Sequence, residues 1–582
     1  MERSLSTYDL IRDNASLADA ARTLKGAEAI GVDLETTSLS PRDGRVRLIQ
    51  LAIPDKTFVV DVFEVNDLSP IKEVLEDGPV KILQNAKFDY AFLYSEHGIR
   101  LSPIFDTMLA AQLLDGGAQG ASYALEAIAE RYLDERLDKS AQKDDWSAEL
   151  SVDQVEYAAR DAAILLPLRE KLAENLEKEE LVGVAEIEFG AVAALSEMEL
   201  AGVKLDVARW RDLEITVRER RDRAADHLES FFPQPEGVLP LEGLGPRLNL
   251  NSPKQITDAF RSLGIELADT KVWTLLKVDH PAARALLEYR ELQKKLGTYL
   301  ETYPSFIHPK TGRIHANFLQ CRVPTGRLAC TSPNIQQIPH EDEFRSCFVA
   351  EQGNTLVIAD YSQIELRILA EVSGDSEFVR AFREGEDLHR LTAATMFGVE
   401  QDVVTKEQRT AAKRINFGLM YGRGAKSLSA QLGTDDEHAR TLIDEYFANY
   451  PKVQRYLQRT ANRALKDRTL RTLAGRVRKF GNTSGLGSVE RGALRREAMN
   501  YPIQGSSADI AKLALAYVRE ELEGLDARLI NCIHDEFVVE CAEEIAPEVA
   551  ERTKAAMTRA GEEILEKVPV EVEVARSREW RK

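Results

Sequence analysis

Short apolar runs alternate with helical patterns through about the first 185 residues. AEAIGVDLET and RVRLIQLAI, followed by TFVVDVF, predict strands. DLSPIKEVLEDG predicts a helix, and KILQNAKFDYAFLYSEHG predicts a strand that passes into a helix. This mixture predicts an α/β or α+β domain with its own hydrophobic core.

From about residue 180 the pattern turns helical, so a domain boundary is expected near 180–195. A Pro- and Gly-rich connector follows at 231–253, and HPAARALLEYRELQKKLGTYLETYP predicts a long helix. Strands return from residue 355, interrupted by a large helical insertion between about 375 and 525. The chain has no internal repeat and no low-complexity tract.

Composition favours a soluble, intracellular protein of several domains. The chain has 582 residues, 44% of them hydrophobic and 30% charged. It has no apolar run of about 18 residues and no evident signal peptide. The five cysteines form no CxxC pair, which fits a reducing compartment. The expected location is the cytoplasm of a bacterial or phage-infected cell, with a trimmed organellar protein as the alternative.

The charge distribution is uneven. The net charge is −20, yet residues 403–500 hold 20 Lys and Arg against 9 Asp and Glu, a net charge of +11. A strongly basic segment in an acidic chain predicts a surface that faces a polyanion. The alternative is a set of solvated helix faces.

Three stretches of the N-terminal part carry acids at spacings that can bring them together. GVDLETTSL places Asp33 and Glu35 two apart, on one face of a strand. QNAKFDY puts Asp89 at an expected helix start, and VEYAARDAA spaces Tyr157 and Asp161 four apart on one helix face. Each stretch alone is typical of exposed strand edges or helix faces. Their combination within one domain-sized segment is specific.

Four converging carboxylates would repel one another unless divalent cations neutralise them. Oxygen-only ligands suit Mg²⁺ or Mn²⁺. Two such ions, about 3.5–4 Å apart, clamp the attacking and leaving oxygens of a phosphodiester. A tyrosine beside them could orient the attacking water. The pattern therefore predicts two-metal phosphodiester chemistry.

With FDTM at 105–108 and SYALEAIAERYL at 122–133, these stretches resemble the DEDD exonucleases whose third motif is YxxxD. The resemblance implies a ribonuclease H-like 3′→5′ exonuclease domain. It implies metal ligation by four acids, with a tyrosine on the water: Asp33, Glu35, Asp89 and Asp161, with Tyr157. Three further residues fall where family members hold the frayed 3′ end: Leu39, Asn85 and Phe88.

A second pair of acids is expected in the C-terminal part. TLVIADYSQIELRILAEVS predicts a strand that ends at Asp360 and runs into a helix carrying Glu365. LINCIHDEFVVE predicts a hairpin with Asp535 and Glu536 at its centre, where adjacent carboxylates are costly to bury. A strand-terminal Asp is most often a helix N-cap. If the strand and the hairpin pair in one sheet, Asp360 and Asp535 converge and can act on a 3′-OH and a triphosphate.

RTAAKRINFGLMYG predicts a helix with two cations and two aromatic rings on one face. Arg409, Lys413, Phe417 and Tyr421 stand at four-residue steps, with Asn416 close to the same stripe. Cations neutralise a triphosphate and an aromatic ring stacks on a base. The alternative is an amphipathic helix with both rings in the core. Gly418 and Gly422 argue against it, because they weaken a helix without filling a core and would leave room for a base pair.

Six motifs in order now resemble those of family A DNA polymerases, from about residue 190 to the end of the chain. They are TGRLACTSPNIQQIP, ADYSQIELRI, DLHRLTAATMFG, RTAAKRINFGLMYG, REAMNYPIQGSSADI and IHDEF. The resemblance implies a multidomain fold: an exonuclease domain at 1–185 and a right-hand polymerase domain at 186–582. Within the latter it implies a thumb at about 195–310, a palm at about 311–384 and 500–582, and fingers at about 385–499.

The resemblance also implies residue roles. The metals would be bound by Asp360, Asp535 and the backbone carbonyl of Tyr361, with Glu536 in support and His534 near the primer terminus. The triphosphate would be held by Arg409, Lys413 and His389, with Lys413 also a candidate proton donor to pyrophosphate. Phe417 would cover the nascent base pair, Tyr421 would lie by the template base, and Gln363 and Glu365 would line the nucleotide pocket. The minor-groove side of the primer–template would be read by Arg327, Arg496, Asn500 and Gln504.

The expected cofactors are two Mg²⁺ or Mn²⁺ ions at each site. The expected partners are primer–template DNA and dNTPs, with no membrane, and the chain is expected to be a monomer that can work with accessory replication proteins. Residues 1–30 leave no room for a 5′-nuclease domain, so the chain resembles the large-fragment type.

Three rival functions remain. An exonuclease alone would use the rest of the chain as a binding platform, whereas a non-catalytic primer–template binding protein should lack the acids of both sites. A single-subunit RNA polymerase would lack Glu365, which in the resembling DNA enzymes occupies the space of a ribose 2′-OH.

Overall fold

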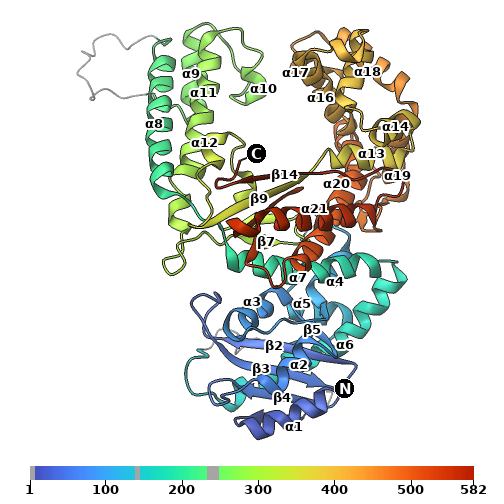
Figure 1. Ribbon diagram of the computed structural model, residues 1–582. Coiled ribbons are helices and arrows are strands. Elements are labelled where there is room, and N and C mark those ends of the chain that lie inside the picture. Colours follow the sequence, from blue (N-terminus) through green and yellow to red (C-terminus); the bar gives the residue numbers. More distant parts are fainter. Residues whose placement is uncertain (1–6, 119, 138–144, 233–247, 582) are drawn as a thin grey trace, which may run out of the picture.

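The computed structural model describes residues 7–118, 120–137, 145–232 and 248–581. Its N-terminal part is built on a six-stranded mixed sheet in the order β1-β4-β3-β2-β5-β6 (Figure 1). Strands β2, β3 and β4 pair antiparallel, and the outer pairs β1–β4, β2–β5 and β5–β6 are parallel. The strands are β1 (Thr7–Ile11), β2 (Ala29–Thr36), β3 (Val46–Ile53), β4 (Lys56–Asp61), β5 (Val80–Leu83) and β6 (Ile104–Asp106).

Helices cover both faces of this sheet. On one face α1 (Asn14–Leu24), α2 (Ser69–Glu76) and α3 (Ala86–His97) bury Val32, Leu34 and Leu51. On the other, α6 (Val152–Lys178) buries Leu48 and Val59. Two shorter helices, α4 (Thr107–Asp115) and α5 (Leu125–Leu133), pack beside α6. The strands and helices predicted here from the apolar pattern are confirmed.

Helix α6 ends at Lys178 and α7 (Val182–Ala201) begins after three intervening residues, close to the expected boundary. Helix α7 packs against both α3 and α20 (Ser488–Glu521), so it joins the two parts of the molecule. The second part is centred on a four-stranded antiparallel sheet in the order β12-β13-β9-β14. Its strands are β9 (Asn354–Tyr361), β12 (Ala527–Ile533), β13 (Glu536–Ala542) and β14 (Val572–Ser577).

Two helical arms extend from this sheet in the same direction, away from the N-terminal part (Figure 1). One arm contains α8 (Val207–Glu229), α9 (Pro253–Ser262), α10 (Val272–Leu275) and α11 (Pro281–Lys295). The other contains α14 (Ser376–Arg383), α15 (Leu388–Phe397), α16 (Lys406–Met420), α17 (Ala425–Leu432) and α18 (Asp436–Asn449). Near the sheet lie β7 (Asn317–Leu319), β8 (Ala329–Thr331), α12 (Asp342–Arg345), α13 (Ile364–Ser373), α19 (Pro451–Asp467) and α21 (Ala546–Glu562).

Two details differ from the sequence-based expectation. The predicted long helix is α-helical only to Lys295 and continues as a π-helical turn over Leu296–Leu300. The helical insertion contains a small hairpin, β10 (Thr469–Arg471) and β11 (Val477–Lys479). The expected connector at 231–253 lies mostly outside the described residues. Among the described residues, no helix is both long and apolar enough to cross a membrane.

Candidate active sites

The N-terminal acids come together at one end of the six-stranded sheet. Asp33 and Glu35 share a face near the end of β2, and Asp89 stands in the first turn of α3. Burial, followed by the charge of Asp161, raises the pKa of Asp33 well above its usual value. Burial and then the charge of Asp33 raise the pKa of Asp89 in the same way. Three acids from β2, α3 and α6 are therefore close enough to repel one another.

Tyr157 lies beside this cluster on the same face of α6 as Asp161. Its hydroxyl donates a hydrogen bond to the Asp161 carboxylate. Burial raises the pKa of Asp161 to about 6, although the bond from Tyr157 and the charge of Arg160 oppose the rise. The Glu35 charge also acts on Tyr157, which places the fourth acid in the same cluster. The five predicted catalytic residues thus come together.

The predicted 3′-end residues lie around the start of α3 and in the loop after β2. Asn85 precedes α3 with a left-handed backbone (φ 60°), and the ring of Phe88 lies 5.0 Å from that of Phe92. Leu39 is 88% exposed. Asp106 lies within the FDTM stretch, which carried no separate prediction for this carboxylate. Its buried carboxylate accepts hydrogen bonds from the backbone N–H of Ala86 at 2.7 Å and Asn85 at 3.4 Å, fixing this helix start.

The second acid pair forms where the predicted strand and hairpin meet. Strand β13 pairs with β9 so that Glu536 stands opposite Asp360, and the N–H of Tyr361 donates to the Asp535 carbonyl at 3.2 Å. Burial and the Asp360 charge raise the pKa of Asp535 to about 7. His534 takes a left-handed conformation (φ 57°) in the turn. The expected convergence of Asp360 and Asp535 is confirmed.

Glu536 has different neighbours from Asp535. It is buried, and it accepts hydrogen bonds from the Arg345 guanidinium at 3.1 Å and the Trp580 indole at 2.8 Å. A buried carboxylate needs such partners. Neither partner was apparent from the sequence, because both are distant in the chain and belong to no motif.

The cationic and aromatic stripe of α16 lies at the edge of the hydrophobic core, against which Phe417 and Tyr421 pack. Arg409, Phe417 and Tyr421 are half-buried and Lys413 is exposed, while Ala412, Ile415, Leu419 and Met420 fill the core. The rings of Phe417 and Tyr421 lie 6.4 Å apart with nearly parallel planes. The Arg409 guanidinium is held by Asp387 at 2.6 Å. Both rings therefore pack against the core without being buried in it, and part of each ring stays exposed.

Two details of this helix differ from the prediction. Asn416 is off the stripe and fully buried, where its amide donates to Nδ1 of His389 at 2.9 Å. Gly422 lies beyond the helix end with a left-handed φ of 66°, and a Cβ there would meet Met499 at 2.5 Å. At Gly418 a Cβ would stand 3.6 Å from Arg423 and 3.8 Å from Leu428, which are ordinary contact distances. The room that these glycines would leave for a base pair stays a prediction.

His389 is buried with its ring 5.8 Å from that of Phe417. Burial lowers its pKa to about 4, so the imidazole is neutral at pH 7. Because Nδ1 accepts the bond from Asn416, this network assigns the ring hydrogen to Nε2.

A chain of hydrogen bonds joins α16 to α13 and the loop after β7. Glu365, 8% exposed in the first turn of α13, accepts from the hydroxyl of Tyr421 and the guanidinium of Arg327. Gln363 precedes α13 with a left-handed backbone (φ 55°). On α20, Arg496, Asn500 and Gln504 stand at four-residue steps on one face.

Two side-chain oxygens of predicted substrate-binding residues are buried without a hydrogen-bond partner among the described residues: Gln363 Oε1 and Asn500 Oδ1. Native proteins rarely leave such atoms unsatisfied.

Divalent cations fit both acid clusters, since crowding raises the pKa of carboxylates that offer only oxygen donors. Across the described ranges, however, no three or more His, Cys, Asp or Glu side chains already surround a common point at metal-binding spacing. The ligand sets stay predictions.

Some cations of the basic segment at 403–500 bind within the protein. Arg476 is buried between Glu188 at 2.5 Å and Asp509 at 2.7 Å. Arg471 donates to the Glu179 carbonyl at 2.9 Å and Lys479 to the Leu114 carbonyl at 2.8 Å. Part of the charge therefore ties the two parts of the molecule together, and the polyanion-facing surface stays a prediction for the rest. No sequence pattern signals these bonds, because the partners are backbone carbonyls and distant acids.

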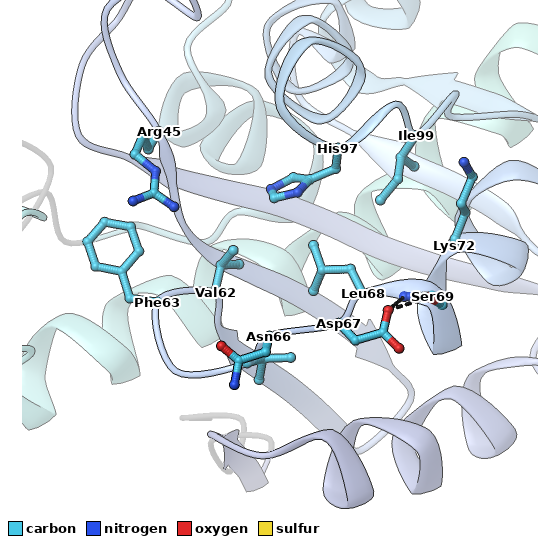
Figure 2. A pocket seen from close by; sticks show the side chains of 11 residues that line it. Arg45, Val62, Phe63, Asn66, Asp67, Leu68, Ser69, Lys72, His97 and Ile99 are labelled. Atoms are coloured by element: carbon cyan, nitrogen blue, oxygen red, sulfur yellow. Dashed lines mark hydrogen bonds between the residues drawn. The ribbon is translucent and has the colours of Figure 1, made fainter.

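A hollow of 680 Å³ lies beside β4, the start of α2 and the end of α3, apart from both acid clusters (Figure 2). Arg45, Phe63, Lys72 and His97 line it. None of the predicted catalytic or substrate-binding residues does, so this hollow is not a candidate active site.

Comparisons with known proteins agree with this geometry. The family model described as DNA polymerase family A matches residues 241–582, and the model described as 3′-5′ exonuclease matches residues 8–177. The chain therefore belongs to DNA polymerase family A and carries a 3′-5′ exonuclease domain ahead of its polymerase domain. The predicted fold class is confirmed.

Relatives extend the match to nearly the whole chain. DNA polymerase I of Aquifex aeolicus is 35% identical over 99% of this chain and 100% of its own length. DNA polymerase I of Chloroflexus aurantiacus is 36% identical over 97% of this chain, which spans only 62% of that relative. A solved structure, the POL domain of Pol1 from M. smegmatis with DNA primer-template and dNTP, is 29% identical. It covers 98% of this chain and 99% of its own, with a TM-score of 0.84.

Proposed function

We propose that this protein is a template-directed DNA polymerase that adds dNTPs to a primer 3′-OH and removes mispaired ends with its 3′→5′ exonuclease domain. The observation that carries the proposal is the meeting of Asp360 and Asp535 across β9 and β13. Tyr421 lies close enough for the Asp535 charge to act on its hydroxyl. The family match and the name of the M. smegmatis complex support DNA and dNTPs as ligands.

Each site is proposed to hold two Mg²⁺ or Mn²⁺ ions. Asp360, Asp535 and the Tyr361 carbonyl would bind those of the polymerase site, and Asp33, Glu35, Asp89 and Asp161 those of the exonuclease site. Such ions stabilise the developing charge on phosphoryl oxygens and lower the pKa of a bound water or hydroxyl. The supporting observation is the crowding of buried carboxylates at both places.

The remaining polymerase residues bind and orient the nucleotide. Arg409 and Lys413 attract the triphosphate from one face of α16, and Lys413 is the candidate donor of a proton to pyrophosphate. His389 can add a neutral Nε2–H donor. Phe417 covers the base pair, while Glu365, held by Tyr421 and Arg327, crowds the position of a ribose 2′-OH.

The duplex and the frayed end have separate binding residues. Arg496, Asn500 and Gln504 reach purine N3 and pyrimidine O2 acceptors, which all base pairs share in the minor groove. Leu39, Asn85 and Phe88 hold an unpaired 3′ end, where Tyr157 orients the attacking water. The division into thumb, palm and fingers, the monomeric state, accessory replication proteins and the cytoplasmic location stay predictions.

One primer-extension experiment tests the proposal. With Mg²⁺ and dNTPs, a labelled primer on a template should lengthen to the template end; without dNTPs it should shorten from its 3′ end. Shortening without lengthening would favour an exonuclease alone. Equal use of rNTPs would favour an RNA polymerase, and neither change would favour a binding protein.

A further inference from the structure

The β10–β11 hairpin lies between the two proposed sites and contacts elements of both. On the exonuclease side, Lys479 donates from its backbone N–H to the Gly116 carbonyl at 2.9 Å and from Nζ to the Leu114 carbonyl at 2.8 Å. The Arg478 guanidinium donates to the Gly117 carbonyl. The last carbonyls of a helix lack helical partners and attract cations. The hairpin therefore caps the end of α4.

The contact at this helix end leaves no room for side chains. Gly116 and Gly117 have left-handed φ angles of 59° and 77°. A Cβ at Gly117 would lie 2.7 Å from the Arg478 guanidinium and 3.1 Å from Pro324. The end of α4 thus packs directly on the loop that leads to Arg327.

The hairpin also reaches the polymerase side in two places. Arg476 lies against Gly326, where a Cβ would be 2.7 Å from its Nε, and Gly326 immediately precedes Arg327. Arg478 donates to the Glu497 carboxylate at 2.8 Å, and Glu497 adjoins Arg496 on α20. Both neighbours, Arg327 and Arg496, are proposed to bind the primer–template.

The other end of α4 lies at the exonuclease site. Asp106, which precedes the helix, accepts the backbone hydrogen bonds that fix Asn85 and Ala86 at the start of α3. A nine-residue helix is about 14 Å long. One short rigid element therefore runs from the 3′-end residues to the hairpin.

We propose that Arg478 is a positioning residue for DNA synthesis. By bridging the α4 end and Glu497, it holds Arg327 and Arg496 where they engage the primer–template. The inference rests on the proposed function. Arg478 touches no acid of either site and acts only through these DNA-binding residues.

The test measures primer–template affinity, the extension rate and single-strand excision for the full chain. Arg478→Ala should weaken primer–template binding about tenfold, while kcat for extension and excision of a single-stranded 3′ end change by about twofold or less. Gly117→Ala, which pushes on the same contact from the exonuclease side, should do the same. Arg478→Lys should restore part of the affinity. Arg463→Ala is the matched control, because that exposed arginine of the same basic segment pairs only with Asp467 on α19.

A double-mutant cycle separates positioning from a general structural role. If Arg478 acts through Arg327 and Arg496, the loss caused by Arg478→Ala should shrink in an Arg327→Ala or an Arg496→Ala background, and fall to about twofold or less when both arginines are alanine. The inference is overturned if Arg478→Ala and either of the other substitutions lower primer–template affinity independently, so that their losses multiply to about a hundredfold. It is also overturned if Arg478→Ala loses extension and excision together. If the wild-type chain extends no primer, the proposed function fails instead, so the two failures are distinguishable.

Discussion

The two acid clusters share a chemistry but differ in the charges around them. In the exonuclease site, acids from β2, α3 and α6 repel one another, and Asp161 has a hydrogen bond from a neutral tyrosine and the charge of Arg160 nearby. In the polymerase site, the charge of Arg327 acts on Asp535, and Arg345 holds the neighbouring Glu536. Arg409 and Lys413 stand nearby on α16.

The proposed substrates account for this difference. A phosphodiester brings one negative charge to the exonuclease site, which the proposed divalent ions, bound by the carboxylates, would balance. A dNTP brings several charges, so the polymerase site needs fixed cations in addition to ions. The two proposed metal sites therefore lie in surroundings that match the charges of their proposed substrates.

The largest expected effect comes from removing acids of one cluster at a time. Asp535→Asn keeps the turn but weakens a metal ligand. Since metal-ion charge stabilisation is worth several kcal/mol, primer extension should fall by about a thousandfold or more. Excision of a single-stranded 3′ end should continue. Asp33→Ala with Glu35→Ala should give the converse, with more misinserted ends retained.

Both activities are measured on both variants, with circular dichroism as the control for folding. The comparison of two independent sites is wrong if either variant is folded and yet loses both activities. Normal extension by Asp535→Asn would mean that this carboxylate only occupies a turn.

A smaller effect is expected for Glu365, which distinguishes the sugar. Glu365→Ala should lower the preference for dNTP over rNTP by about a hundredfold or more, because a relieved clash is worth a few kcal/mol. The overall rate should also fall, since Arg327 and Tyr421 lose their shared partner. Glu365→Gln keeps the volume and should keep most of the discrimination. An unchanged ratio of kcat/KM values in Glu365→Ala would remove this residue from the nucleotide pocket.

Local sequence patterns predicted the acids of both sites because each acid belongs to a short motif on one strand or helix. Asp33 with Glu35, and Tyr157 with Asp161, follow the periods of a strand and a helix. The convergence of Asp360 with Asp535 needed the pairing of β9 with β13, which apolar patterning made plausible.

Partners that depend on tertiary packing were not predictable from the sequence. Glu536 is held by Arg345 and Trp580, about 190 and 44 residues away in the chain. The same limit holds for the basic segment: composition counts its charges but does not show which of them, such as Arg476, face buried acids.

The third expected effect concerns Phe417, whose ring is predicted to lie beside the sugar of the incoming nucleotide in the polymerase site. Phe417→Tyr should ease incorporation of dideoxynucleotides by about tenfold, because the new hydroxyl can supply a polar contact that the missing 3′-OH leaves vacant. Competition between a ddNTP and its dNTP on a sequencing-type gel measures the ratio. Phe417→Leu, which adds no hydroxyl, is the control. Equal terminator bands for Phe417 and Tyr at this position would mean that the ring is not beside the sugar.

The smallest expected effect concerns Glu188, a buried carboxylate that belongs to neither acid cluster. Glu188 is fully buried, whereas Asp33, Asp161 and Asp535 are half-buried, and Lys512 and Arg476 each lie 2.5 Å from it. Burial alone would raise its pKa, yet these two cations lower it to about 2. Because the folded-state pKa lies below that of the unfolded chain, the charge stabilises the fold above about pH 4.5, and this contribution is lost as pH falls toward 2. Glu188→Gln leaves Lys512 without its acid and Arg476 with Asp509 alone, and should lower the thermal midpoint by several degrees at pH 7. The difference from wild type should shrink between pH 5 and pH 3.

Lys204→Met, which breaks a partly exposed pair with Glu351, is the control and should cost much less. A difference for Glu188→Gln that stays constant down to pH 3 would mean that the pairing does not lower the pKa of this carboxyl.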